Sequence, residues 1–122
     1  MVAAGDLNLN LEELDSPPLL ATAERRRAGL SEAGVRLYDP WYELPYPERG
    51  SAAYQGSWQT PDHFLLAPGL LDERGLTYRA GGFRVVRLPF LVHAASGFPR
   101  RFEAASGTSD HLPLLLEIVL SD

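Results

Sequence analysis

The apolar stretches of this sequence are short, and each ends at a glycine, a proline or a polar motif. Residues 2–4 are apolar and lead into GDLN at residues 5–8, while residues 112–120 form a nearly continuous apolar run. Short apolar runs bounded by turn residues are typical of strands, and a continuous run is typical of a strand covered on both faces. The sequence therefore predicts buried strands at residues 2–4 and 112–120.

Other segments between these two strands have different local signatures. Ser16 followed by two prolines is a favourable helix start, which predicts a helix over residues 17–27. Residues 38–57 are rich in proline, tyrosine, tryptophan and glycine, which predicts an ordered loop of the kind that often carries recognition. Residues 58–67 predict a further strand, and a final turn-rich stretch precedes residue 112.

Length and composition limit the classes of protein that fit. The 122 residues allow one domain at most, and the formal net charge of -5 argues against a general nucleic-acid clamp without excluding a nuclease. The absence of cysteine excludes disulfides, thiolate zinc sites and cysteine nucleophiles. The sequence indicates neither a signal peptide nor a membrane segment, because a charge at Asp6 interrupts the opening apolar residues and every apolar run is too short to span.

The first polar motif follows the first predicted strand. In an extended strand Asp6 and Asn8 point the same way, so a carboxylate and an amide lie side by side. Such a pair can orient a water and stabilise charge on a phosphate. The alternative is a simple Asx turn that closes the strand.

Two further motifs carry an acid next to a histidine. Asp62 lies within an otherwise apolar strand, where an unpaired carboxylate is costly, so a histidine or cation is expected beside it. Asp110 and His111 precede the last strand, and an aspartate next to a histidine can serve both metal binding and proton transfer. The alternatives are a solvated acid at a strand start and a polar turn.

The three motifs together match a known pattern. They are GDLN at residues 5–8, W-x-x-x-D-x-F-L-L at residues 58–66 and G-x-S-D-H-L-P-L at residues 107–114. In this order they resemble the endonuclease/exonuclease/phosphatase superfamily. That group includes DNase I-like nucleases, exonuclease III-like repair enzymes, sphingomyelinases and inositol phosphatases.

The resemblance implies a role for each motif residue. Asp6 would act near the attacking or leaving oxygen and contribute to a metal site, and Asn8 would hold the scissile phosphate. Asp62 would pair with the catalytic His111, which would contact the phosphate or handle the proton. Asp110 would be a metal or water ligand. The implied reaction is hydrolysis of a phosphate ester with Mg²⁺ or Mn²⁺ as cofactor, and nucleic acid is among the candidate substrates.

The resemblance also implies a fold. It is an α+β arrangement, the C-terminal half of a four-layer α/β/β/α sandwich, with one largely antiparallel mixed sheet and a helix layer. Residues 1–122 would form a single partial domain, because the asparagine and metal-binding glutamate of the first half have no counterpart here. We therefore expect a missing N-terminal half or a partner chain, and an inactive site in the isolated chain.

The sequence favours a nuclease-like phosphodiesterase and leaves two alternatives. One is a truncated remnant or interaction module that keeps the motifs without catalysis. The other is a phosphatase that acts on lipid or sugar phosphates. The compartment is not indicated.

Other polar and aromatic residues have structural interpretations. His63 follows Asp62 in a strand, so its ring should face away from the site. Trp41 is expected to pack the aromatic loop onto the core, with stacking on a base as the alternative. Arg100 and Arg101 are interpreted as part of a solvated turn, with a phosphate contact as the alternative.

Overall fold

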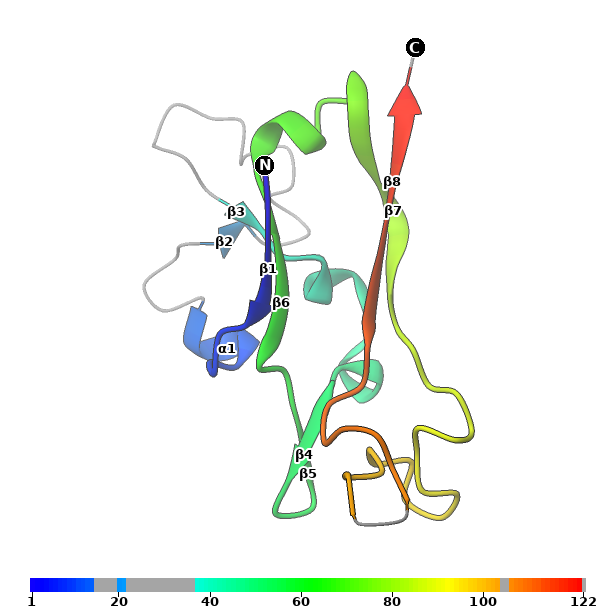
Figure 1. The fold of residues 1–122 in the computed structure, drawn as a ribbon. Helices are drawn as coiled ribbons and strands as arrows, with labels where there is room; N and C mark the ends of the chain where they lie inside the picture. Colours follow the sequence, from blue (N-terminus) through cyan, green and yellow to red (C-terminus); the bar gives the residue numbers. More distant parts are fainter. Residues whose placement is uncertain (15–19, 22–36, 104–105, 122) are drawn as a thin grey trace.

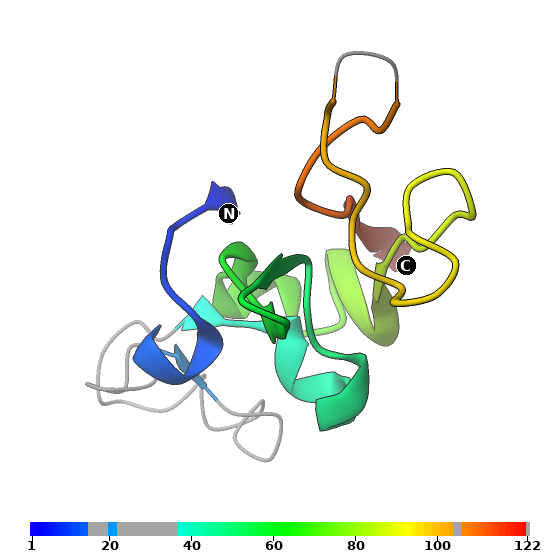
Figure 2. The ribbon, with the colours of Figure 1, turned by 90° about the horizontal axis from the view of Figure 1, so that it is seen from below.

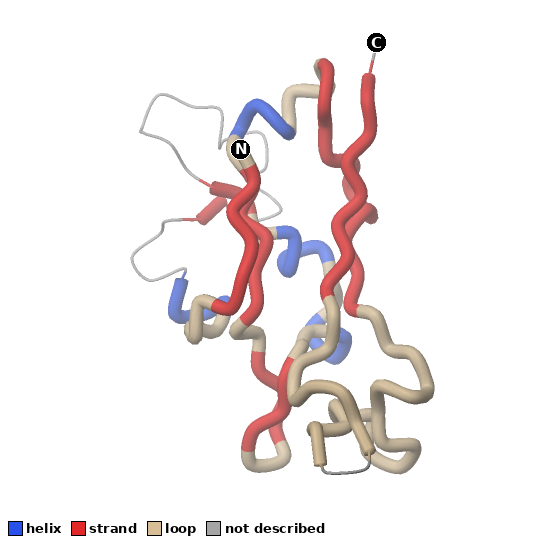
Figure 3. Tube along the Cα trace, in the orientation of Figure 1, coloured by secondary structure: helices blue, strands red, loops and turns tan. Residues whose placement is uncertain are grey.

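The structure, a computed structural model, is built mainly from strands and describes residues 1–14, 20–21, 37–103 and 106–121. Figure 1 shows two upright strand pairs side by side, with a small hairpin and a long loop together at the lower end. Figure 2 shows the ribbon from below, and Figure 3 shows the arrangement of Figure 1 by secondary structure, with short helical segments between strands. Within the described ranges, no helix is long and apolar enough to cross a membrane.

A four-stranded sheet carries two of the three sequence motifs. Its strand order is β1-β6-β3-β2. β1 pairs antiparallel with β6, β6 pairs antiparallel with β3, and the short β3 and β2 run parallel. The strands are β1 (Val2–Asp6), β6 (Asp62–Leu66), β3 (Leu37–Tyr38) and β2 (Leu20–Ala21).

Two antiparallel strand pairs complete the described sheets. β4 (Ala52–Tyr54) and β5 (Ser57–Gln59) form a hairpin. Its two turn residues, Gln55 and Gly56, have φ of 48° and 79°, the left-handed values that tight hairpin turns require. β7 (Gly75–Val85) pairs with β8 (Leu114–Ser121), and the register shifts between Tyr78 and Phe83.

The core lies where the four-stranded sheet meets β7. Short helical segments fill this space because their aromatic and leucine side chains point inward. Trp41 is fully buried, and its ring meets Phe83 edge-on with centroids 5.0 Å apart. This agrees with the structural interpretation of Trp41. The segments that contribute buried side chains are α1 (Leu11–Leu14) and the 3₁₀ helices η3 (Pro40–Glu43) and η5 (Pro68–Leu70), whereas η4 (Tyr46–Glu48) contributes none.

Both strands that the sequence predicts as buried are more exposed than expected. All five residues of β1 are exposed, and Leu120 of β8 is 75% exposed. The prediction of burial was therefore wrong, although the prediction of strands at these places was correct. An apolar run shows that a strand can be covered, whereas burial depends on a neighbouring layer. β1 is an edge strand of its sheet, and β8 pairs with β7 alone.

The fold class agrees with the sequence at a coarse level. The protein is sheet-rich, broadly α+β, with small and mainly antiparallel sheets. The expected single sheet is instead three separate ones. Leu20 and Ala21 form β2 within the helix predicted over residues 17–27, so that prediction was wrong at these positions, where pairing with β3 overrides local helix propensity. The rest of the predicted helix lies outside the described residues.

Candidate functional site

Two carboxylates face each other across neighbouring strands. Asp6 ends β1, Asp62 begins β6, and the two residues are direct partners in the antiparallel register. Directly opposed residues of an antiparallel pair project from the same face of the sheet. Like charges in this position repel each other, so a cation between them would lower the energy of the pair. The GDLN motif and the second motif therefore meet at one end of the β1–β6 ladder.

His111 reaches the same place from the far end of the sequence. The loop before β8 returns to β4, where Ala52 and His111 form an isolated antiparallel bridge and the Leu112 backbone N–H donates to the Ser51 carbonyl at 2.6 Å. This brings His111 Nδ1 to 2.8 Å from Asp62 Oδ2. The side chains remain 30% and 19% exposed, so the pair is open to solvent.

Asp6, Asp62 and His111 form a compact group that could hold a metal ion. One ligand atom from each residue lies within 4.8 Å of the others. Mg²⁺ in proteins is usually held by one or two carboxylates, with waters and substrate phosphate completing its shell, and Mn²⁺ accepts the same oxygen ligands. Asp6 and Asp62 fit this description. His111 Nδ1 already faces Asp62, so the carboxylate oxygens are the better candidate ligands.

Ser51 makes a second contact to the same carboxylate oxygen. Its hydroxyl donates to Asp62 Oδ2 at 2.5 Å, and the residue is fully buried. Its backbone is also held on both sides, because Ser51 N–H donates to the Gln59 carbonyl and its own carbonyl accepts from Leu112 N–H. Ser51 therefore connects the strand that carries Asp62 to the segment that carries His111.

The GDLN motif closes as a tight turn. Asn8 has φ of 56°, a left-handed conformation that asparagine tolerates well, and its backbone N–H donates to Asp6 Oδ1 at 2.8 Å. Leu7 N–H donates to the Pro61 carbonyl at 2.8 Å, which joins the turn to the residue before Asp62. The alternative of an Asx turn is thus present in the structure. The turn holds one oxygen of Asp6 and leaves the other available.

Asn8 and Asp110 lie at the rim of the metal-binding group, outside the group itself. With His111 they line a hollow of about 310 Å³ beside the carboxylates. Asp110 is exposed and is not one of the three residues whose ligand atoms converge. The structure therefore places all five sequence-predicted residues in one region, with Asp6, Asp62 and His111 at its centre.

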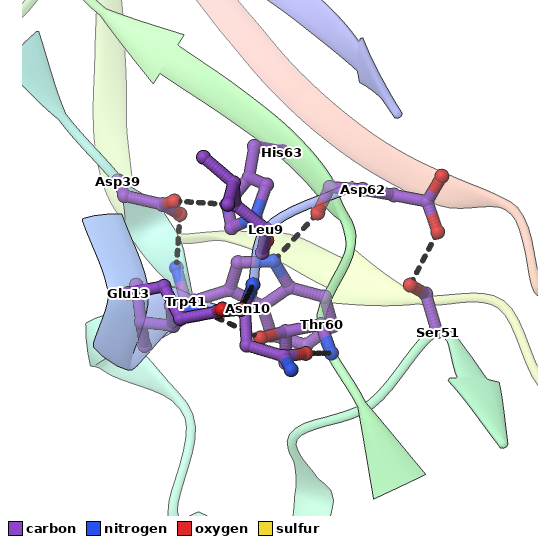
Figure 4. A network of polar contacts seen from close by, with 10 residues as sticks. Leu9, Asn10, Glu13, Asp39, Trp41, Ser51, Thr60, Asp62 and His63 are labelled. Carbon is purple, nitrogen blue, oxygen red and sulfur yellow. Dashed lines mark hydrogen bonds and ion pairs between the residues drawn. The ribbon is translucent and has the colours of Figure 1, made fainter. Parts of the chain in front are cut away.

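A second aspartate–histidine pair lies on the other side of β6. His63 Nδ1 is 2.5 Å from Asp39 Oδ2, and both side chains are completely buried. His63 Nε2 is 2.8 Å from the Leu9 carbonyl, so this nitrogen donates. Figure 4 shows His63 directed toward Asp39 and Leu9, while Asp62 points the opposite way toward Ser51. The expectation that His63 faces away from the site agrees with this arrangement.

Burial and pairing determine the protonation of this second pair. Burial alone would lower the pKa of His63, but the hydrogen bond and charge of Asp39 outweigh it, so the pKa lies above its ordinary value. Burial raises the pKa of Asp39 against the opposing effect of His63. Because the Leu9 carbonyl can only accept, the ring is protonated at Nε2 and a further proton lies between Nδ1 and the carboxyl group.

This buried pair connects the turn after Asp6 to the strand that begins at Asp62. Asp39 Oδ1 accepts the Trp41 backbone N–H at 3.0 Å, and the Trp41 indole N–H donates to the Asp62 carbonyl at 2.8 Å. His63 Nε2 donates to the carbonyl of Leu9, the residue that directly follows the GDLN motif. The network therefore keeps the backbone on both sides of the opposed carboxylates in place.

Asn10 and Thr60 add a second connection between the same segments. The Asn10 side-chain oxygen accepts the Thr60 backbone N–H at 2.8 Å, and the Thr60 hydroxyl accepts the Leu11 N–H at 2.9 Å. Glu13 accepts the Asn10 backbone N–H at 2.6 Å, the return contact of a helix capping box. Figure 4 shows these contacts beside the buried histidine pair. The start of α1 is thereby attached to the residues that precede Asp62.

The sequence reasoning missed Ser51 and Asp39. Ser51 is a single small residue between glycine and alanine, and nothing in its neighbours predicts a carboxylate partner. Asp39 precedes Pro40 and caps the 3₁₀ helix η3, a signal that does predict a cap. Its second role, as the partner of His63, depends on a residue 24 positions away, so the residues next to Asp39 do not predict it.

Comparisons with known proteins yield no relative for this chain. No protein-family model, curated protein or solved structure matches it. The opposed carboxylates, His111 and the hollow beside them, together with the motif resemblance, are therefore the basis for a functional proposal.

Proposed function

We propose that this chain carries the reacting residues of a metal-dependent phosphodiesterase of the endonuclease/exonuclease/phosphatase type. The observation that supports the proposal most is the convergence of Asp6, Asp62 and His111, whose ligand atoms lie within 4.8 Å of one another. These residues come from three separate motifs. Two opposed carboxylates with a histidine are a set suited to holding a cation and moving a proton at one place.

His111 is the proposed proton-transfer group. An ionised Asp62 can only accept, so Nδ1 of His111 donates to it and the ring is held in one tautomer. This leaves Nε2 to take a proton from a water or give one to a leaving oxygen. Partial exposure of the ring keeps Nε2 within reach of a bound ester. Asp62 and Ser51 orient the ring in this scheme.

Asp6 and Asp62 are the proposed metal-holding carboxylates. A bound Mg²⁺ or Mn²⁺ would supply Lewis-acid stabilisation of the phosphate charge. The chain itself holds Asp6 in a turn whose Asn8 backbone N–H donates to Oδ1. Asp62 is held by Ser51 and His111 on Oδ2. Each carboxylate is thus held in position by hydrogen bonds to one of its oxygens. Its second oxygen is the one proposed to contact the metal ion.

The proposed hydrolysis conserves both atoms and protons. A water oxygen forms a bond to phosphorus, the bond from phosphorus to the leaving oxygen breaks, and one proton passes from the water to the leaving oxygen. Asn8 lines the hollow beside His111, where its amide can donate to a non-bridging phosphate oxygen. His111 is the group that exchanges the proton.

The direct test is hydrolysis of bis(p-nitrophenyl) phosphate at high protein concentration with Mg²⁺, with Mn²⁺ and with chelator. The motif resemblance predicts an inactive isolated chain, but the convergence of Asp6, Asp62 and His111 leads us to expect slow metal-dependent turnover. The rate should be low because three protein groups provide few ligands for the ion. His111→Gln should reduce the rate by about a hundredfold or more, to background, as removal of a general acid–base group does. Asp62→Asn should do the same, whereas Glu73→Gln, an exposed acid outside the site, should not.

Equal rates in the wild type and His111→Gln would rule out the proposed role of this histidine. Complete absence of metal-dependent turnover would instead favour the second candidate function, an interaction module that retains the motifs. The exposed apolar residues of β1 and β8, among them Leu120 at 75% exposure and Ile118 at 38%, favour that candidate. An interaction module of this kind should associate with another chain or with itself, which sedimentation velocity measures. Leu120→Ser should weaken the association, and His111→Gln should leave it intact.

A further inference from the structure

The hollow beside His111 has a second wall that the proposed chemistry does not use. This wall is formed by Tyr54, at the end of β4, and by Arg101, in the long loop between β7 and β8. Both side chains are exposed, Tyr54 to 62%. An aromatic ring and a cation next to a phosphodiester site are the two groups that a nucleotide chain would contact.

Tyr54 is presented by a rigid hairpin. The opposite face of the hairpin is anchored at Trp58, which stacks under the Arg87 guanidinium at 4.4 Å and meets Phe98 edge-on at 5.0 Å. Gly50 lies so close to Trp58 that a Cβ there would be 2.6 Å from the indole ring. The backbone that carries Tyr54 is therefore supported by the packing of Trp58 on the opposite face of the hairpin.

The hairpin register places Tyr54 close to the reacting residues. Ala52 bridges to His111, and Ala52 and Tyr54 share one face of β4 because they are two positions apart. Two positions along a strand correspond to about 7 Å. A ring at this distance can stack on a group attached to the ester without displacing the phosphate from His111.

The backbone of Arg101 is held where the residues around 100 and 108 come together. The Arg100 carbonyl accepts the Thr108 N–H at 3.1 Å, and Gly107 approaches the Arg101 carbonyl so closely that any Cβ would overlap it. Among the residues that the structure describes, none forms a hydrogen bond or ion pair with the Arg101 guanidinium. Arg101 also lines a neighbouring hollow of about 260 Å³, so this residue borders two hollows. The exposure of Arg101 agrees with the interpretation of a solvated turn, and its place in the lining of both hollows keeps the alternative of a phosphate contact open.

We propose that Tyr54 and Arg101 determine the substrate class of the proposed phosphodiesterase, and that this class is single-stranded nucleic acid. Tyr54 stacks on the base next to the scissile phosphate, and Arg101 binds a flanking phosphate. The inference rests on the proposed function. An unpaired base is required because stacking on an exposed ring uses a base face that a duplex keeps covered. The net charge of -5 also disfavours a long duplex, which would need a basic surface.

Binding of a short fluorescein-labelled oligothymidylate, followed by fluorescence anisotropy without divalent metal, tests this inference independently of turnover. Tyr54→Ala should weaken binding about tenfold, and Tyr54→Phe should retain it, because the ring supplies the stacking. Arg101→Gln should reduce the slope of log K against log salt concentration by about 0.7, the loss of one phosphate contact on a single strand. A duplex of the same sequence should bind more weakly than the single strand.

Matched controls come from exposed residues away from the hollow. Phe90→Ala removes another aromatic ring, 59% exposed, and Arg79→Gln removes another exposed arginine. Both should bind the oligonucleotide as the wild type does. Unchanged affinity in Tyr54→Ala, or equal losses in Tyr54→Ala and Phe90→Ala, overturns the inference.

The inference and the proposed function can fail separately. A chain that hydrolyses bis(p-nitrophenyl) phosphate with Mg²⁺ but neither binds nor cleaves the oligonucleotide retains its function and loses this substrate class. Preferential cleavage of a glycerophosphodiester, the deacylated form of a phospholipid, would also retain the function and contradict this substrate class. Oligonucleotide binding that depends on Tyr54, with no hydrolysis of any diester, contradicts the phosphodiesterase proposal while retaining the binding surface.

Discussion

Asp6 and Asp62 lie directly opposite each other in the β1–β6 ladder, so two carboxylates share one face of the sheet at its end. Repulsion between them costs stability, and hydrogen bonds from the Asn8 backbone and Ser51 offset only part of this cost. Because Asp62 also pairs with Ser51 and His111, the effect of removing Asp6 should have opposite signs in the absence and presence of metal.

Asp6→Asn should stabilise the metal-free chain by about 0.2 to 1 kcal/mol, because it removes one of two opposed like charges. The same substitution should abolish any rise in melting temperature on addition of millimolar Mg²⁺ or Mn²⁺, since a bound ligand stabilises the folded state by mass action. Differential scanning fluorimetry with chelator and with metal measures both effects.

Asp110→Asn is the matched control for that experiment. Asp110 is exposed and lies outside the three-residue group, so we expect the variant to retain the metal-dependent rise in melting temperature. Loss of the rise in Asp110→Asn but not in Asp6→Asn would show that the sequence-based assignment of Asp110 as the metal ligand is the better one.

Ser51→Ala should destabilise the protein by about 1.5 to 3 kcal/mol, the range for a hydrogen bond to a charged group. The hydroxyl is fully buried and donates to Asp62, so its removal leaves a carboxylate oxygen with one donor fewer. Urea unfolding measures the change. Ser96→Ala, which removes a hydroxyl that accepts from Phe98 N–H in an exposed bend, should change the unfolding free energy by less.

Ser51→Ala should also lower the rate of diester hydrolysis per folded molecule. Its hydroxyl and His111 share one oxygen of Asp62, and the loss of one donor frees that carboxylate to turn. Ser51→Thr retains the hydroxyl and should recover more of the rate than Ser51→Ala. Equal rates in wild type and Ser51→Ala would limit Ser51 to a structural role.

The buried pair on the other side of β6 should behave as a unit. His63→Leu leaves the Asp39 carboxyl group buried without its partner and should cost about 3 to 5 kcal/mol. Asp39→Leu combined with His63→Leu should cost less than the sum of the two single changes, because the double variant leaves neither group unpaired. Urea unfolding of all four proteins gives the coupling energy, and an additive result would contradict the pairing.

Gly50→Ala tests the packing that supports Tyr54. A Cβ at Gly50 would lie 2.6 Å from the Trp58 ring, and the residue has φ of 147°, so the variant should lose about 1 to 3 kcal/mol. Gly56→Ala at the hairpin tip has φ of 79° but open space around it, so it should lose less, about 1 kcal/mol. Thermal unfolding followed by tryptophan fluorescence compares the two, and equal losses would count against the steric argument.

Local patterns predict only part of this fold. The alternation around Asp62 and the apolar residues after His111 predict strands, and both are present as β6 and β8. The predicted strand over residues 58–67 is divided in the structure, because Pro61 cannot donate to a ladder and β5 ends at Gln59. Leu20 and Ala21 lie in a strand because they pair with β3, an interaction that no local pattern reports.

The candidate site divides in the same way. The sequence by itself predicted which side chains are candidates for chemistry and that each follows or begins a strand, since charge, strand periodicity and turn residues are local properties. It also determined that Asp62 and His63 face opposite sides, because neighbours in a strand alternate. The motif resemblance predicted that Asp62 pairs with His111, and the 2.8 Å contact between them agrees with this. Only the tertiary structure decided that Asp62 meets Asp6 and Ser51, while His63 meets Asp39. Such contacts join residues far apart in the chain, and their energies depend on burial and register that form only when the whole chain packs.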